Sequence, residues 1–175
     1  MALYQPLTLL DMVVYHRENA NIERIKEVRC YHPYRTIPAD IRKSACAIFA
    51  NEVINKTIRE EGYVPELFEF LEQTFIQLDD LATGVEYFPL IFLVRLSYLL
   101  GFGATTQDVV LGTRMLSGED EVKLRELLEA SYGESLSLTT LQRRELLDVM
   151  LRFYADHMEW LGDWKSITVL REVMM

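Results

Sequence analysis

The chain has 175 residues, of which 50% are hydrophobic and 26% are charged. This is the profile of a globular protein with ample core material, which excludes a disordered chain. No segment reaches the roughly 18 uninterrupted apolar residues that a membrane span needs. The nearest, residues 88–100, is short and contains Pro89 and Arg95. We therefore expect no membrane association.

The net charge of −9 is unevenly distributed. Residues 1–60 carry nine Lys and Arg against seven Asp and Glu, whereas residues 61–175 carry nine against twenty. An acidic protein repels nucleic acid, so any basic surface is expected near the start of the chain. The two cysteines, Cys30 and Cys46, are too few for a zinc ribbon and indicate buried thiols in a reducing compartment. The sequence thus favours a cytoplasmic location.

The first segments of the chain are predicted to form a β-hairpin. Residues 7–16 and 22–31 are rich in β-branched and aromatic residues, and residues 17–21 between them include two asparagines, which suit a turn. A two-stranded hairpin is marginal by itself, because it cannot bury both faces and its edges stay unpaired. We therefore expect it to need a partner.

The rest of the chain has helical spacing of its apolar residues. Helices are predicted over residues 38–61, 64–83, 88–100, 119–131, 139–157 and 166–173. Residues 88–100 are apolar almost all round and should form the helix against which the others pack. Residues 104–118 are predicted to form a connecting segment that contains one turn or a short strand. The predicted fold is mainly α, a bundle of about five or six helices preceded by a β-hairpin.

Motifs for catalysis or metal binding are absent from the sequence. His16, His32 and His157 have no metal-ligand spacing, and no serine lies in a nucleophile-elbow motif. The glycines in residues 101–103 follow a predicted helix and suit its C-terminal cap rather than a dinucleotide loop. We expect neither an enzyme nor a cofactor.

Arg95 lies in the most apolar segment, where an unpaired buried charge would cost several kcal/mol. One interpretation is a structural ion pair with Glu69, Glu72 or Asp148. The other is a cation at the edge of an apolar groove that receives a carboxylate from a partner.

The hairpin region also mixes basic and aromatic residues, as single-strand binding surfaces do. The basic residues are Arg17, Arg24, Lys26, Arg29 and Arg35, and the aromatic ones are Tyr15, Tyr31, His32 and Tyr34. Acidic residues dilute this charge, namely Glu18, Glu23 and Glu27. An ordinary solvated hairpin is therefore the alternative.

A family resemblance is carried by five segments in a fixed order: "LYQPLTLLDMVVYH", "IERIKEVRCYHPYRTI", "DIRKSACAIFANEVINKTIREEGYVPELFEFLEQTFIQLD", "LIFLVRLSYLLGFG" and "LLDVMLRFYADHMEWLGDWKSITVLREVM". Together they resemble the RecO family of bacterial DNA repair proteins, especially its Bacteroidetes members. The resemblance covers nearly the whole chain and is weakest over residues 104–118. It implies that residues 1–37 are the C-terminal remnant of an OB-fold domain, and that residues 38–175 form a RecO-type α-helical domain.

The resemblance also implies a function. It is that of a recombination mediator in the RecF pathway, which binds and anneals single-stranded DNA, associates with RecR and with the C-terminal tail of single-strand binding protein, and assists RecA loading in the nucleoid. The implied DNA contacts are Arg17, Arg24, Lys26, Arg29 and Arg35. The chemistry of the tail, an apolar residue with a carboxylate, suggests a pocket formed by Phe92, Arg95, Leu96, Leu99 and Lys165.

The sequence departs from the family in two places. It lacks the four-cysteine zinc element that many members carry after the segment matching residues 88–100, so we expect no zinc. It also starts in what corresponds to the middle of the OB barrel. We therefore expect weakened DNA binding and an open hairpin edge through which two copies could pair. The alternative is a helical interaction domain with no nucleic-acid role, which the acidic residues 61–175 favour.

Overall fold

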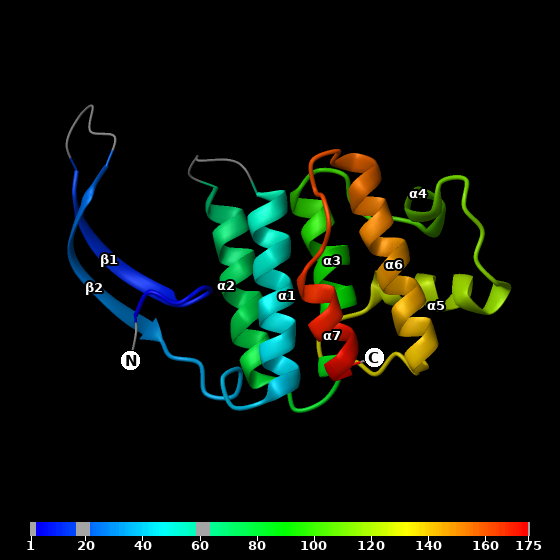
Figure 1. Cartoon of the computed structure of the whole chain (residues 1–175), viewed down its shortest axis with the longest axis horizontal. Coiled ribbons are helices and arrows are strands. Elements are labelled where there is room, and N and C mark those ends of the chain that lie inside the picture. The colour runs from blue at the N-terminus through cyan, green and yellow to red at the C-terminus, as the bar shows by residue number, and fades with distance from the viewer. Residues whose placement is uncertain (1–2, 17–21, 59–63, 175) are drawn as a thin grey trace.

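A computed structural model describes residues 3–16, 22–58 and 64–174 of the chain (Figure 1). Strands β1 (Leu9–Tyr15) and β2 (Arg24–His32) form an antiparallel hairpin. The hairpin stands at one end of the molecule, beside a bundle of helices (Figure 1). The predicted architecture, a mainly helical bundle preceded by a β-hairpin, is therefore confirmed; the predicted turn at residues 17–21 lies outside the described residues.

The helices follow the predicted order closely. Their bounds are α1 Ile41–Thr57, α2 Pro65–Asp80, the 3-10 turn η1 Val85–Tyr87, α3 Phe88–Leu99, α4 Gln107–Leu111, α5 Gly118–Glu129, α6 Thr140–His157 and α7 Ser166–Met174. Within the segment expected to be a connection, the turn is helical and forms the short α4. Thr139 and Gln142 form the capping box that their spacing predicts at the start of α6.

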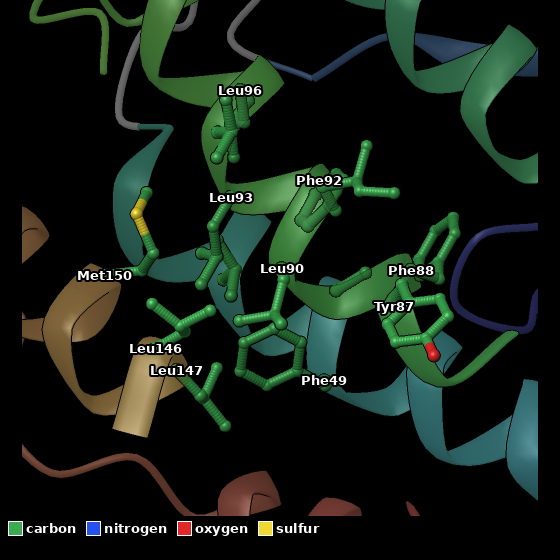
Figure 2. Close-up of a cluster of buried hydrophobic side chains, with 14 of the residues drawn as sticks. Phe49, Tyr87, Phe88, Leu90, Phe92, Leu93, Leu96, Leu146, Leu147 and Met150 are labelled. Carbon is green, nitrogen blue, oxygen red and sulfur yellow. The ribbon is translucent and has the colours of Figure 1, made fainter. Parts of the chain in front are cut away.

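Helix α3 lies at the centre of the bundle, as its apolar composition predicts. It contacts α1, α2, α5 and α6. Figure 2 shows Leu90 and Leu93 of α3 facing Phe49 of α1 and Leu146 of α6. The Tyr154 hydroxyl of α6 donates a hydrogen bond to the Leu93 carbonyl at 2.7 Å, which satisfies a buried polar group inside this contact. Among the described residues, no helix has both the length and the apolar composition to cross a membrane.

Helix α7 is held against α1 by two side chains. The Glu52 carboxylate of α1 accepts hydrogen bonds from the backbone N–H groups of Lys165 and Ser166, at 2.9 and 2.7 Å. It therefore acts as an N-terminal cap that another helix supplies. One turn further along α1, the Lys56 ammonium donates to the Leu161 carbonyl at 2.6 Å, which fixes the turn that leads into α7.

Candidate functional site

The hairpin has an apolar face and a polar face, because paired residues alternate between the two sides of a sheet. The cross-strand pairs of the apolar face are Leu10 with Cys30, Met12 with Val28 and Val14 with Ile25. Those of the polar face are Asp11 with Arg29, Val13 with Glu27 and Tyr15 with Arg24. Met12, Val14 and Ile25 remain 42–48% exposed, so the helices do not cover the distal part of the apolar face.

Three of the predicted DNA-binding residues lie on this hairpin. Arg24 and Arg29 belong to the polar face, and Lys26 occupies the irregularity between the pairs of Val13 and Val14. The Arg29 guanidinium lies 2.6 Å from the Asp11 carboxylate, and the Lys26 ammonium lies 3.6 Å from that of Glu27. The hairpin thus presents three cations, and neighbouring carboxylates partly neutralise the charges of Lys26 and Arg29. Arg17 lies outside the described residues.

Arg35 belongs to the linker between β2 and α1, where its neighbours are fixed by one carboxylate. Asp79, at the end of α2, accepts hydrogen bonds from the backbone N–H groups of Arg35, Thr36 and Ile37 at 2.9, 2.8 and 2.8 Å. The buried Lys43 ammonium donates to the Asp79 carbonyl at 2.7 Å. These contacts, here named the Asp79 clamp, hold the base of the hairpin on α1 and α2.

The clamp also changes the acidity of its central group. Burial acts to raise the pKa of Asp79, but the hydrogen bonds from the three backbone N–H groups outweigh it and hold the pKa below its ordinary value. Sequence reasoning missed Asp79, because an aspartate in the last turn of a helix carries no local signal of a distant partner.

A hollow separates the hairpin base from the start of α1. Its volume is about 160 Å³, and its lining includes Leu7, Cys30, His32, Tyr34 and Ile37. The Tyr34 hydroxyl donates to the Leu7 carbonyl at 3.0 Å beside it. The hairpin therefore meets the bundle at its base.

Arg95 is held by polar atoms of the segment after α5. Its Nη2 donates to the Ala130 carbonyl at 3.2 Å and to the Ser131 hydroxyl at 3.1 Å. Its guanidinium lies 5.0 Å from the centre of the Tyr132 ring, a cation–π contact. A backbone carbonyl and an aromatic face thus take the place of a carboxylate.

The expected ion pair of Arg95 with Glu69, Glu72 or Asp148 is therefore wrong for the described residues. Glu72 instead accepts a hydrogen bond from the hairpin, and Asp148 pairs with an arginine of α7. Arg95 faces the segment after α5 rather than these three carboxylates.

The five residues predicted to bind a peptide tail do not form one pocket. Phe92 and Leu96 are fully buried in the core, whereas Leu99 is 42% exposed. Lys165 lies exposed in the segment before α7, on the α1 side of the bundle. Because α3 is apolar all round, its sequence does not show which residues reach the surface.

Arg95 instead borders a hollow of about 460 Å³ between the end of α2 and the segment after α5. Gln77, Leu81 and Tyr132 also line it. This hollow offers a ligand one cation, Arg95, and little apolar surface. No group of three or more His, Cys, Asp and Glu side chains able to hold a metal ion is found in the part of the chain that the structure describes.

Comparison with known proteins agrees with the resemblance inferred from the sequence. The model of the family described as "Recombination protein O C terminal" matches residues 38–120. The DNA repair protein RecO of Phocaeicola vulgatus is 31% identical, over 98% of this chain and 79% of that protein. The RecO protein of Flavobacterium johnsoniae is 28% identical, over 99% and 79%. No solved structure matches. The chain belongs to the RecO family.

Proposed function

We propose that this protein is a recombination mediator of the RecF pathway in bacterial DNA repair, which binds single-stranded DNA and assists strand annealing and RecA loading. Membership of a family whose similar members are named DNA repair proteins supports this role. The observation that carries the proposal is the position of Arg24, Lys26 and Arg29 on a hairpin that stands beside the acidic bundle (Figure 1).

The hairpin has the chemistry of a single-strand surface. Among the described residues, no hydrogen bond or ion pair involves the Arg24 side chain, which leaves it available to a phosphate. Tyr15 and Tyr31 are 51% and 41% exposed and offer rings on which bases can stack. Residues 1–37 are then part of an OB-fold domain, and residues 38–175 are the helical domain that carries it.

Fluorescence anisotropy with a labelled oligothymidylate tests the DNA-binding part. We expect binding at low salt that weakens as salt is added, because phosphate contacts release counterions. The second candidate, a helical interaction domain without a nucleic-acid role, is favoured by the twenty acidic residues of the segment 61–175. Absence of binding at both low and moderate salt would support that candidate and contradict the proposal.

We further propose that the helical domain binds the tail of single-strand binding protein, with Arg95 as the cation for its carboxylate. Leu99 and Lys165 are the exposed members of the predicted set, Arg95 is partly buried, and Phe92 and Leu96 support α3 from the core. Titration with a peptide copying that tail is the test. Unchanged affinity in Arg95→Ala would reject Arg95 as the receiving cation.

The remaining proposals concern assembly and location. RecR is proposed as a partner, and co-migration of the two purified proteins in size-exclusion chromatography would test this. Two copies are proposed to pair through the hairpin edge, because β1 and β2 form a sheet to which no other strand is added among the described residues. A chain that sediments as a monomer even at high protein concentration would contradict pairing.

A nucleoid-associated cytoplasmic location is also proposed, and imaging of a fluorescent fusion tests it.

A further inference from the structure

Helix α2 lies on the hairpin side of the bundle and holds the hairpin through two carboxylates (Figure 1). Asp79 binds the backbone of the linker after β2, as part of the Asp79 clamp. Glu72, seven residues earlier, accepts a hydrogen bond from the Tyr31 hydroxyl of β2. Seven residues are about two helical turns, so both carboxylates lie on one face of α2, about 10 Å apart along its axis. The contact between Tyr31 and Glu72 is named the latch here.

The clamp and the latch differ in how easily they can open. The Asp79 side chain is buried and binds backbone N–H groups, which no change of rotamer can withdraw. The latch joins two side chains near the surface, since Tyr31 is 41% exposed and Glu72 is half-buried. Within the described residues, β1 and β2 make no extensive contact with any helix. The clamp is therefore a fixed pivot, and the latch is a contact that the hairpin can make or lose.

The hairpin has room to move about this pivot. The hollow of about 160 Å³ at its base is lined by Cys30 and His32 of β2 on one side and by Ile37 and Ala47 on the other. A close-packed contact would resist a shift of the strand, whereas an unfilled hollow gives way to it. The latch can thus open while the clamp stays closed.

Tyr31 also belongs to the proposed single-strand surface. Its ring is one on which a base could stack, and Arg29 lies two residues before it on β2. Burial, the hydrogen bond to Glu72 and the negative charges of Glu72 and Asp11 raise the pKa of Tyr31 to about 12, so its hydroxyl remains a donor at neutral pH. A base stacked on this ring would bring its phosphates close to the Glu72 carboxylate, and like charges repel.

We propose that the latch is an autoinhibitory contact, in which Glu72 holds Tyr31 on α2 and lowers the affinity of the hairpin for a single strand. A bound strand in turn releases the hairpin from α2. The coupling is reciprocal, so strand binding weakens the latch by the same factor by which the latch weakens strand binding. The inference rests on the proposed DNA-binding function and adds a regulation of that site.

Anisotropy titrations with oligothymidylate at about 0.1 M salt, where distant charges are screened, test the inhibition. Glu72→Gln removes the negative charge, and Tyr31→Phe keeps the ring but removes the donor. Each should raise the affinity about threefold to tenfold. The double variant should gain no more than the better single variant, because both changes open the same contact. Tyr31→Ala should bind more weakly than Tyr31→Phe, since the stacking ring is lost.

Glu69→Gln is the matched control. Glu69 is an exposed carboxylate of α2, three residues before Glu72, and it forms no hydrogen bond or ion pair among the described residues. Its substitution removes the same charge without touching Tyr31, so the affinity should rise less than about twofold. An equal gain in Glu69→Gln and Glu72→Gln would assign the effect to the general charge of α2 and overturn the inference.

Amide hydrogen exchange without DNA separates this inference from the proposed function. Exchange in β2 should become faster in both Tyr31→Phe and Glu72→Gln, and stay unchanged in Glu69→Gln, because a freed hairpin opens more often. Unchanged exchange in both latch variants would overturn the inference whether or not DNA binds. If the unmodified chain binds oligothymidylate and the latch variants bind no better, the inference alone fails. If no variant binds it, the proposed function fails as well.

Discussion

The Asp79 clamp predicts a large effect from a single substitution. Asp79→Ala removes the acceptor for three backbone N–H groups of the linker between β2 and α1. Arg35 and Thr36 are exposed and can turn toward water, whereas Ile37 is 9% exposed and its N–H would be left without a partner. A hydrogen bond to a charged acceptor contributes about 1.5–3 kcal/mol, and an orphaned buried donor costs a similar amount. We expect a loss of about 3 kcal/mol in the free energy of unfolding, since the three bonds are not additive.

Urea unfolding followed by circular dichroism measures this loss. The matched control is Asp80→Ala, because Asp80 is the next residue along α2 and is exposed. The control should stay within about 0.5 kcal/mol of the unmodified chain. If Asp79→Ala also stayed within that range, the clamp would not stabilise the fold, and the reasoning would be refuted.

The same carboxylate gives the clamp a pH dependence. Because the pKa of Asp79 is lower in the folded chain than its ordinary value of 3.8, its contribution is complete above pH 3.8. It is lost as the pH falls from there through the folded-state pKa. The stability difference between the unmodified chain and Asp79→Ala should therefore shrink as the solution is acidified below pH 3.8.

Three further effects follow from the contacts. Burial acts to raise the pKa of Glu52, but its hydrogen bonds from Ser166 and Lys165 outweigh burial and lower the pKa. Glu52→Gln should therefore lower the stability of the folded chain by about 1 kcal/mol at neutral pH, measured as faster amide hydrogen exchange in α7. Arg95→Met should cost about 1–2 kcal/mol in urea unfolding, because the bond to Ala130 and the ring contact are lost. The five candidate DNA cations limit the slope of log affinity against log salt to about −3.5, which oligothymidylate titrations at several salt concentrations measure.

Much of the fold could be predicted because its signals are local. The spacing of apolar residues located the helices, and Thr139 with Gln142 marked the start of α6 within one residue. The almost entirely apolar residues 88–100 identified the central helix. Residues 104–118 have no clear period, and their helix α4 spans only five residues, too short for a period to develop.

Contacts between distant segments could not be predicted in the same way. Asp79 binds a linker more than forty residues earlier in the chain. Arg95 was expected to need a carboxylate, yet it contacts the carbonyl of Ala130 and the ring of Tyr132 instead. Phe92 was assigned to a surface pocket although it is fully buried, because burial depends on which faces of α3 the other helices cover.

The charged residues of α6 show the same limit. On α6 alone, alternating charges four residues apart are typical of a solvated helix face. Only the folded chain pairs Arg114 with Asp156 and Arg171 with Asp148, and leaves Arg144 and Arg152 without a partner among the described residues.

The most direct test of the central claim, that the hairpin is the single-strand surface, is an anisotropy titration of the Arg24→Ala, Lys26→Ala, Arg29→Ala triple variant. At low salt we expect at least about a tenfold loss of affinity for oligothymidylate and a salt slope shallower by up to about 2, since up to three phosphate contacts are removed. Arg125→Ala, which removes an exposed arginine of α5, should bind as the unmodified chain does. Equal affinity and an equal salt slope for the triple variant and the unmodified chain would contradict the claim.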